Sequence, residues 1–451
     1  MIKKLLIANR GEIALRIIRA CRELGIQTVA IYSQADTDSL HVSLADEAYC
    51  VGPYQSEKSY LNIPAIISVA LTTGADAIHP GYGFMSERAD FVEICNDHNL
   101  TFIGPSVKSI REMGDKANAR STMKAHGVPI TPGTDLLKDA ESAMKFIKKH
   151  GYPVIIKATA GGGGKGMRIA HNDRELKEMF TICQTEAQNA FGNPDVYIEK
   201  FIENPRHIEI QVIADKYGKV RYFPERDCSI QRRHQKLLEE SPSSVISGSI
   251  RKAMGEAAVK VVKAIHYEGV GTVEFLLDKN NKFYFMEMNT RLQVEHGVSE
   301  MVTGIDIVQE QIKIASGEKI SFSQKDVILN GHAIECRINA EDTEKDFRPT
   351  PGEIEGYIIP GGFGVRVDSH AYTGYKIPPY YDSMIGKLIC WGKTREDARR
   401  RMLRALEEYL ILGVKTTIDF HKKILSHDKF IKGTFDTSFI EKYFSEAKAK
   451  K

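Results

Sequence analysis

Short apolar runs alternate with amphipathic stretches over the first hundred residues. The runs at 3–8 and 28–32 are typical of buried strands, and two further runs end at Ile78 and Ile103. Between the first two runs, the apolar positions of residues 13–24 recur at helical spacing. Strands that alternate with helices in this way predict a parallel sheet with helices on its faces.

The first strand-to-helix turn of this region, residues 8–12, contains a single glycine, Gly11. The Gly-x-Gly-x-x-Gly fingerprint of dinucleotide-binding sheets is therefore absent. We interpret the region as a Rossmann-type unit that need not bind NAD.

The pattern changes near residue 114. A helix is predicted at 115–126, and the apolar strand at 154–157 runs into a glycine cluster. Five further strands are predicted at Tyr197–Ile202, His207–Ile213, Val220–Phe223, Thr272–Leu277 and Phe283–Met288, with one helix at Ile250–His266. From about residue 331 the pattern predicts more strands, including His332–Ile338, a helix at Arg395–Leu412, and a Lys-rich end.

Composition and charge narrow the class of protein. Lys and Arg total 62 and Asp and Glu total 59 in 451 residues, a net charge of +3, which gives no basic excess for nucleic acid. We see no apolar stretch of about 18 residues or more that would predict a membrane span. The seven cysteines are scattered and form no Cys-x-x-Cys pair, so we expect reduced cytosolic thiols rather than disulfides or a zinc site.

Four consecutive glycines, Gly161–Gly164, follow the strand at 154–157. Without Cβ atoms, their backbone N–H groups can approach an anion closely. The cluster is not a Walker P-loop, because Gly166 follows Lys165 where Ser or Thr would bind Mg²⁺. We favour a mobile lid over a phosphate; a flexible surface loop is the alternative.

The strands at 272–277 and 283–288 read as a hairpin centred on Asn280 and Asn281. In that register Glu274 and Glu287 lie opposite each other, with Cβ atoms roughly 5 Å apart. Like charges so placed repel unless a cation lies between them, and Mg²⁺ bound to substrate phosphates supplies one. The alternative is that one glutamate points to solvent or pairs with lysine.

Beyond the hairpin every second residue is polar. In an extended chain these side chains project to one face and combine metal ligands, a guanidinium and a carboxylate able to act as a base. An ordinary amphipathic strand is the alternative. The five residues are Glu287, Asn289, Arg291, Gln293 and Glu295.

Two other segments carry unusual residues. Residues 225–236 form a dense basic loop, which is either a solvated charge run or an anion-binding segment. Its Cys228 is expected to be structural, because no partner for a nucleophile is evident. Residues 79–84, His-Pro-Gly-Tyr-Gly-Phe, end a predicted strand, where sites in α/β sheets lie, although a tight turn is an equal alternative.

Taken in order, these motifs resemble biotin carboxylase. The resemblance runs from about residue 2 to 440 and is carried by the sequences at 8–14, 79–84, 104–105, 114–116, 161–166, 225–236 and 287–296. Three positions depart from the family's usual pattern: Gly297 stands for Pro, Arg88 for Asn and Met85 for Leu. We expect Gly297 to loosen the backbone beside Glu295.

The resemblance implies a multidomain α/β and α+β fold. We expect a Rossmann-like N-terminal domain at 1–113, an ATP-grasp domain at 114–330 with its lid at about 131–203, a mixed α+β C-terminal domain at 331–446 and a solvated tail at 447–451.

The implied reaction makes carboxyphosphate from ATP and bicarbonate and then carboxylates biotin N1′. Glu295 is implied as the base, Arg337 as the residue that stabilises the biotin enolate beside Tyr82, and Glu274, Glu287 and Asn289 as ligands of two Mg²⁺ or Mn²⁺ ions. The implied bicarbonate site comprises Lys236, Arg291, Gln293 and Val294. The implied ATP contacts are Lys116, Lys157, Gly161, Gly162, Gly163, Gly164, Gly166, Met167, Glu199, Lys200, Ile202, His207, Gln231, His234 and Leu276.

The resemblance also implies partners. The biotinylation signal Ala-Met-Lys-Met is absent, so biotin is expected on a separate biotin carboxyl carrier protein, with separate carboxyltransferase subunits. A cytoplasmic homodimer is implied, with contacts at Arg19, Glu23, Phe363 and Arg366. Acetyl-CoA carboxylase in fatty acid synthesis is the expected setting; pyruvate or propionyl-CoA carboxylase, or a carbamoyl phosphate synthase-like ligase, are the alternatives. No nucleic-acid or membrane partner is expected.

Overall fold

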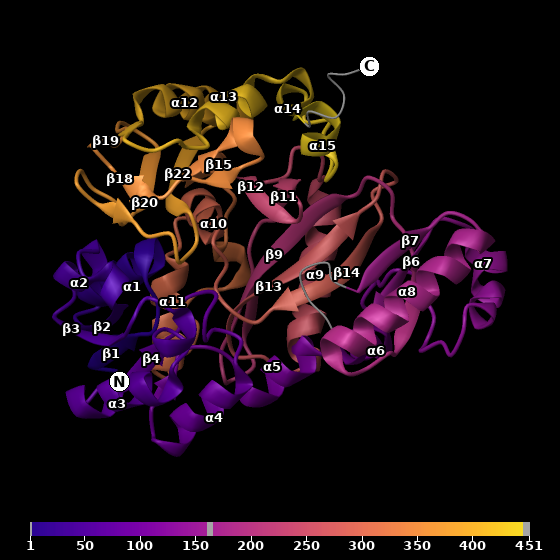
Figure 1. The fold of residues 1–451 in the computed structure, drawn as a ribbon, viewed down its shortest axis with the longest axis horizontal. Helices are drawn as coiled ribbons and strands as arrows, with labels where there is room; N and C mark the ends of the chain where they lie inside the picture. Colours follow the sequence, from indigo (N-terminus) through magenta and orange to yellow (C-terminus); the bar gives the residue numbers. More distant parts are fainter. Residues whose placement is uncertain (1, 160–165, 445–451) are drawn as a thin grey trace.

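The computed structural model describes residues 2–159 and 166–444 of the chain (Figure 1). The predicted glycine lid at Gly161–Gly164 and the predicted tail at 447–451 lie outside these residues. Within the described ranges, no helix has both the length and the apolar character needed to cross a membrane.

The N-terminal part is a parallel sheet, as the sequence predicts, and its five strands have the order β3-β2-β1-β4-β5. Successive residues of a strand face opposite sides, so Leu5 and Ile7 pack against α1, whereas Leu6 packs on the other face against α3 and α4. The elements are β1 (Lys4–Ile7), α1 (Gly11–Glu23), β2 (Gln27–Ser33), α2 (Leu40–Leu44), β3 (Glu47–Gly52), α3 (Ile63–Thr73), β4 (Ala77–His79), α4 (Ala89–Asp97), β5 (Thr101–Phe102) and α5 (Val107–Gly114).

A nine-stranded antiparallel sheet runs through the rest of the molecule, along the path β14-β13-β9-β11-β12-β15-β22-β20 with β10 beside β9. Strand β15 follows residue 331 and pairs with β12, so the C-terminal segment continues the central sheet. Its strands are β9 (Arg206–Ala214), β10 (Val220–Tyr222), β11 (Arg226–Arg232), β12 (Gln235–Ser241), β13 (Gly269–Leu277), β14 (Phe283–Asn289), β15 (His332–Asn339), β20 (Val365–Ser369) and β22 (Met384–Gly392).

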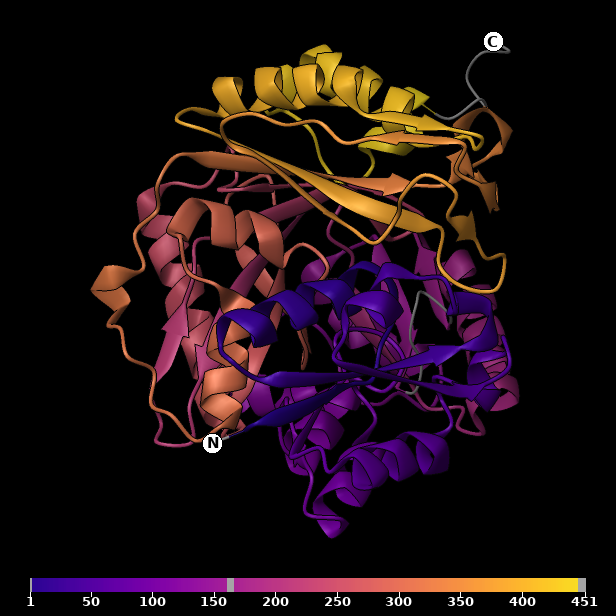
Figure 2. The same cartoon turned by 90° about the vertical axis from the view of Figure 1, so that its left-hand side faces the viewer.

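Helices cover this sheet in two groups. Helix α9 packs its apolar face, including Met254 and Val261, on β9 and β13. The C-terminal helices lie above β15 and β22, as Figure 2 shows, and pack there through Met402 and Leu406. The helices are α9 (Gly248–Ala264), α10 (His296–Thr303), α11 (Ile307–Ala315), α12 (Arg395–Glu408), α13 (Ile418–Ser426), α14 (Asp428–Ile431) and α15 (Phe439–Phe444).

A three-stranded sheet, β7-β6-β8, forms a separate lobe with two helices against it (Figure 1). The segment at 129–134 joins this lobe to the large sheet, because Ile130 bridges to Phe285 of β14 and Gly133 bridges to Glu199 of β8. The lobe and its approach contain α6 (Lys116–Ala125), α7 (Met144–His150), β6 (Val154–Ala158), β7 (Met167–Ala170), α8 (Asp173–Phe191) and β8 (Val196–Lys200).

The helix predicted at Arg395–Leu412 is too long. It ends at Glu408, because Tyr409 is extended and the next three residues pair as a strand. The small pairs around it are β16 (Glu341–Asp342) with β17 (Arg348–Pro349), β18 (Gly352–Glu353) with β21 (Lys376–Ile377), and β19 (Gly356–Ile358) with β23 (Leu410–Leu412).

The basic loop predicted at 225–236 is a hairpin, β11–β12. Its turn residues Arg233 and His234 have φ of 49° and 66°. Such turns favour Asn and Gly, so an Arg-His turn gives no hairpin signal in the sequence.

Candidate active site

The predicted opposition of Glu274 and Glu287 is confirmed, since the two residues pair directly across β13 and β14. The predicted turn is off by one residue: Leu277 pairs with Phe283, which centres the turn on Asn280. A register shift beside Glu274 restores the predicted pairing from there to the end of β14.

Four side chains contact the Glu274 carboxylate, and three of them lie within 2.9 Å. His207 Nε2 lies 2.9 Å from Oε2, and Lys236 Nζ and Asn289 Nδ2 each donate to Oε1 at 2.9 Å. Burial raises the pKa of Glu274, but Lys236 and His207 outweigh it and hold that pKa far below its usual value. Glu287 is more open and lies 3.3 Å from Lys116 Nζ. Each carboxylate thus lies next to a lysine, which is the pairing that the alternative interpretation expects, and the metal site stays a prediction.

Glu295 lies between two cations. Lys236 Nζ donates to its Oε1 at 2.6 Å and Arg337 Nη2 donates to its Oε2 at 2.8 Å. The side chain is fully buried. Burial alone raises its pKa, but Lys236, Arg337 and Arg226 hold the pKa of Glu295 well below the usual range. The carboxylate is therefore ionised.

The predicted extended run at 287–295 is only half right. Strand β14 ends at Asn289, and helix α10 begins at His296, so the residues between them form a turn. The side chains still converge, because Arg291 donates to Asn289 Oδ1 at 3.0 Å and Gln293 donates to Glu274 Oε1 at 3.3 Å. The turn brings them together where a strand would have spread them out.

Four charged residues of the cluster were missed from the sequence. Glu209 accepts from Lys236 Nζ at 2.6 Å and from Arg226, and Glu87 accepts from Arg291 Nε at 2.9 Å. The fourth, Glu239, contacts Arg337. A signal for Glu209 exists in β9, where His, Glu and Gln alternate with Ile over 207–211. Arg226 lies in the basic segment 225–236 already singled out, whereas Glu87 and Glu239 carry no such signal.

The implied nucleotide residues lie on the small lobe and the adjoining strands. Lys157 Nζ and Arg120 Nη1 both contact the Glu199 carboxylate, at 2.9 and 3.1 Å, and lower its pKa against the effect of burial. Met167 pairs with Lys157 across β6 and β7, and Gly166 accepts a hydrogen bond from the Ala158 N–H.

The remaining implied ATP contacts are not all directed into one site. Lys200 Nζ donates to the Tyr152 carbonyl at 2.7 Å, so its charge is directed at backbone. Ile202, Leu276 and Gln231 are half-buried, whereas His234 at the hairpin turn is exposed.

Tyr82, implied to lie beside biotin, donates its hydroxyl to the buried Glu12. Lys387 Nζ lies 3.2 Å from the same carboxylate and donates to the Val294 carbonyl at 2.8 Å. A buried lysine of β22 therefore links α1 to the turn that carries Gln293 and Glu295.

The four implied dimer contacts lie on α1 and around β20. Phe363 is 77% exposed, an unusual value for an aromatic side chain, and Arg19 is also exposed. Glu23 accepts from Gln309, and Arg366 donates to Glu300 Oε2 at 2.7 Å.

Gly297 lies in the first turn of α10 rather than in a loose segment. A Cβ there would come within 2.3 Å of Ile389 Cδ1, so glycine allows β22 to pack closely against the helix. The structure offers no sign of the loosening that we expect from the sequence.

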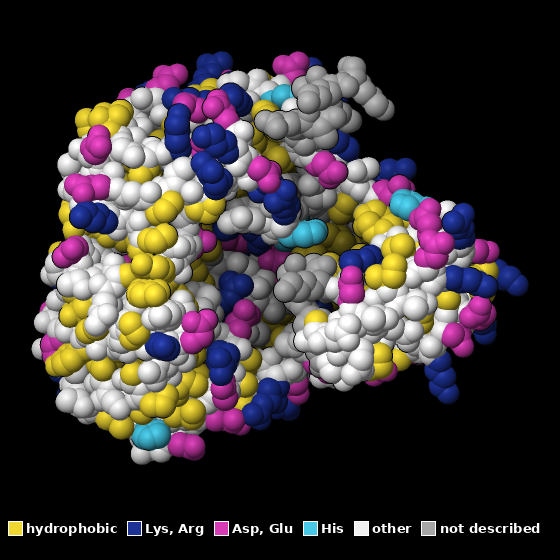
Figure 3. Space-filling view, in the orientation of Figure 1, with side chains coloured by type: hydrophobic (Ala, Val, Ile, Leu, Met, Phe, Trp, Pro, Cys, Tyr) yellow, Lys and Arg dark blue, Asp and Glu magenta, His cyan; other side chains and the backbone are white. Residues whose placement is uncertain are grey.

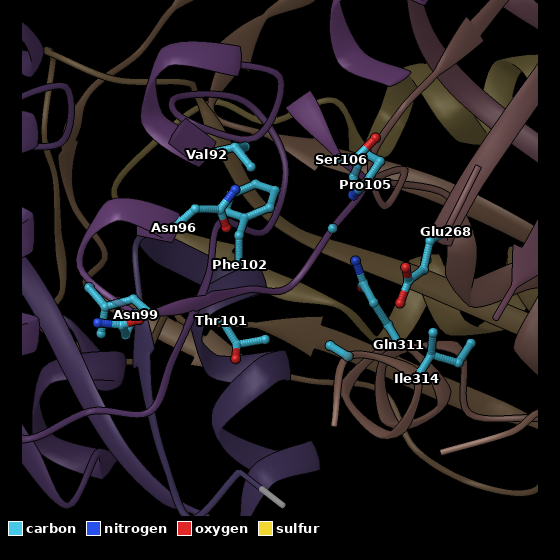
Figure 4. Close-up of a pocket in the computed structure, with 14 residues that line it drawn as sticks. Val92, Asn96, Asn99, Thr101, Phe102, Pro105, Ser106, Glu268, Gln311 and Ile314 are labelled. Carbon is cyan, nitrogen blue, oxygen red and sulfur yellow. The ribbon is translucent and has the colours of Figure 1, made fainter. Parts of the chain in front are cut away.

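Figure 3 shows a hollow near the middle of one face, with Lys, Arg, Asp and Glu side chains around it. A separate cavity of about 470 Å³ lies between α4, β5 and α11 (Figure 4). Phe102, Glu268 and Gln311 line it, and none of the implied site residues does. The cavity is therefore not part of the cluster around Glu295.

Comparison with known proteins covers nearly the whole chain. Residues 1–110 match the family model of the biotin carboxylase N-terminal domain, 115–323 that of the carbamoyl-phosphate synthase L chain ATP binding domain, and 335–442 that of the biotin carboxylase C-terminal domain. The chain is 62% identical over 445 residues to biotin carboxylase 1 of Bacillus subtilis, covering 98% of this chain and 99% of that one. It is 54% identical to a pyruvate carboxylase subunit from Methanothermobacter thermautotrophicus, over 98% and 90% of the two chains.

Solved structures of biotin carboxylases have the same fold as this chain. A biotin carboxylase from Campylobacter jejuni superposes with a TM-score of 0.94 at 53% identity, covering 98% of this chain and 99% of that one. The biotin carboxylase domain dimer of 2-oxoglutarate carboxylase from Hydrogenobacter thermophilus, in complex with MgADP, ADP and bicarbonate, superposes with a TM-score of 0.91 at 52% identity and 98% coverage of both chains.

Proposed function

This chain belongs to the biotin carboxylase family of ATP-dependent ligases, and we propose that it carboxylates biotin with ATP and bicarbonate. The observation that carries the proposal is the position of Glu295 between Lys236 and Arg337, next to the opposed pair Glu274 and Glu287. The residues proposed as base, as anion site and as metal ligands thus adjoin one another.

The residues present fit a divalent cation. Glu274 and Glu287 face each other and offer carboxylate oxygens, and Asn289 offers an amide oxygen, all of which are ligands that Mg²⁺ prefers. We propose these three as the ligands of two Mg²⁺ or Mn²⁺ ions. Bound there, the metal would stabilise charge on the phosphates of ATP, together with Lys116 and Lys157.

Glu295 is proposed to remove the bicarbonate proton. Its ionised carboxylate can accept that proton while Lys236, Arg291 and Gln293 hold the anion. A bicarbonate that takes over the contacts of Lys236 and Arg337 would also raise the pKa of Glu295 and make it a better base. Attack of the bicarbonate oxygen on the γ-phosphorus then releases ADP and gives carboxyphosphate, which must be protected from hydrolysis.

The second step is proposed to occur between the same turn and Tyr82. Carboxyphosphate releases CO₂, and the phosphate left behind takes the N1′ proton of biotin. The resulting enolate is negative at oxygen, and Arg337 stabilises it with its guanidinium. The N1′ of this enolate then attacks the carbon of CO₂, and the new N–C bond gives carboxybiotin. Val294, the fourth residue of the implied bicarbonate site, is positioned by Lys387 through its carbonyl.

The residues that the resemblance implies as ATP contacts are proposed to bind ATP, and they include the glycines that lie outside the described residues. The chain is proposed to divide into domains at residues 113 and 330. The large sheet crosses the second of these boundaries, because β15 pairs with β12.

The proposed partners are a biotin carboxyl carrier protein, carboxyltransferase subunits and a second copy of this chain. The exposed Phe363 beside Arg366 supports the dimer, and sedimentation of Arg366→Glu tests it by loss of the dimer peak. A cytoplasmic location is proposed because the reaction consumes ATP and all seven cysteines are free.

The test is phosphate release by the purified chain with Mg²⁺, ATP, bicarbonate and free biotin. We expect release to require bicarbonate and to rise when biotin is added; no response to biotin would contradict the proposal. Ammonia in place of biotin tests the carbamoyl phosphate alternative, and we expect no stimulation by it.

The parent carboxylase is proposed to be acetyl-CoA carboxylase, and the relatives also include a component of pyruvate carboxylase. Capture of the biotinylated carrier with its carboxyltransferase, followed by assay with acetyl-CoA, propionyl-CoA and pyruvate, decides among these acceptors.

A further inference from the structure

The Arg337 guanidinium contacts a second carboxylate besides Glu295, that of Glu239. Glu239 Oε1 accepts from Arg337 Nε at 2.7 Å and lies 2.6 Å from Nη2. Nη2 also donates to Glu295 Oε2 at 2.8 Å. The guanidinium therefore bridges the proposed base and a carboxylate to which the proposed function gives no role.

This contact comes from strand geometry. Glu239 on β12 pairs with Glu335 on β15, which places it diagonal to Arg337 on the same face of the sheet. Because Nε lies next to the aliphatic stem, a bond to Nε fixes the plane of the guanidinium, whereas a bond to Nη2 alone leaves it free to turn.

Glu239 is fully buried, and among the described residues its side chain makes hydrogen bonds to Arg337 alone. Removing a carboxylate from water is costly unless it is paired, so Arg337 is the group that makes this position tenable. Arg337 depends on Glu239 in turn. Without Glu239, the guanidinium would lose its hydrogen bond at Nε and would be free to rotate toward Glu295.

We propose that Glu239 is a positioning residue, which orients Arg337 beside Glu295 for the carboxylation of biotin. The inference rests on the proposed function. It assigns Glu239 to the second step, the one at biotin, and not to the cleavage of ATP.

The chain provides a matched control in Glu335. It lies opposite Glu239 in register and is likewise fully buried, but among the described residues neither of its carboxylate oxygens has a hydrogen-bond partner. Glu335→Gln therefore makes the same substitution on the neighbouring strand and leaves the hydrogen bonds of Arg337 to Glu239 and Glu295 in place.

The experiment measures two rates in the full-length protein: bicarbonate-dependent ATP cleavage without biotin, and the rise in cleavage when free biotin is added. For Glu239→Gln we expect the biotin-dependent rate to fall at least tenfold. The rate without biotin and the KM for bicarbonate should change less than threefold, because Glu295 keeps Lys236. Glu335→Gln should leave both rates within threefold of the parent.

Equal losses in both rates, or no loss in either, would overturn the inference. The double variant Glu239→Gln with Arg337→Gln removes both charges and guards against a fold defect caused by one unpaired charge. It should match Arg337→Gln alone, and a further loss would show that Glu239 acts by another route. A parent protein without any response to biotin would instead refute the proposed function.

Discussion

Glu274 lies directly opposite Glu287 across the β13–β14 pair, although the pairs nearer the turn are displaced by one residue. Met286 is the extra residue that restores the register, which is the property of a β-bulge. Such bulges redirect side chains next to active sites, and here the effect is to place two carboxylates face to face beside Lys116 and Lys236.

Removing one of these carboxylates should weaken metal binding. For Glu287→Gln we expect the Mg²⁺ concentration that gives half-maximal phosphate release to rise about tenfold or more, since one hard oxygen ligand of full charge is lost. A Mg²⁺ titration of the biotin-stimulated reaction measures it. The exposed Glu318→Gln serves as the control, and an unchanged titration for Glu287→Gln would exclude this residue as a ligand.

Loss of the Glu295 carboxylate should strongly lower turnover without weakening nucleotide binding. General bases contribute about 10²–10⁴-fold, so Glu295→Gln is expected to lower biotin-dependent turnover by a factor in that range. The dissociation constant for ATP, measured by calorimetry, should stay within a few-fold of the value for the parent. Retained turnover would show that another group takes the bicarbonate proton.

The buried Lys387 should matter for stability. Lys387→Met leaves Glu12 buried without its cation, and breaking a buried pair in this way costs about 3–5 kcal/mol. Urea unfolding should show that loss in the free energy of unfolding. The double variant Lys387→Met with Glu12→Gln should recover part of it, and equal instability of the two variants would mean that the charge pairing is irrelevant.

Acid should remove the stabilisation that comes from Glu240. Burial raises the pKa of this carboxyl, but Arg395 and His332 outweigh burial and lower it to about 2 from an ordinary value of 4.5. The folded state then binds fewer protons than the unfolded state between these values. The contribution, roughly 3 kcal/mol, is complete above pH 4.5 and is lost as the pH falls toward 2.

The measurement is the difference in free energy of unfolding between the parent and Glu240→Gln at a series of pH values. We expect the difference to be largest at neutral pH and to shrink below pH 4.5. Glu355→Gln, at an exposed position, should show no such trend. A difference that stays constant with pH would assign the effect to packing alone.

The sequence predicted much of the local structure and part of the site. Strand and helix periodicity identified the parallel sheet, and turn residues near Asn280 identified the hairpin that opposes Glu274 to Glu287. It failed at the Arg233-His234 turn and at Tyr409, where tertiary pairing outweighs local preference.

The sequence by itself determined the contacts between residues that are close along the chain. The helix or strand periodicity and the turn type fix which of these side chains share a face. Only the tertiary structure decided the rest. Glu239 meets Arg337 across 98 residues and Lys387 meets Val294 across 93. Such contacts depend on which strands become neighbours in the large sheet. Buried charges then find their partners through the order of the strands, and no local pattern specifies that order.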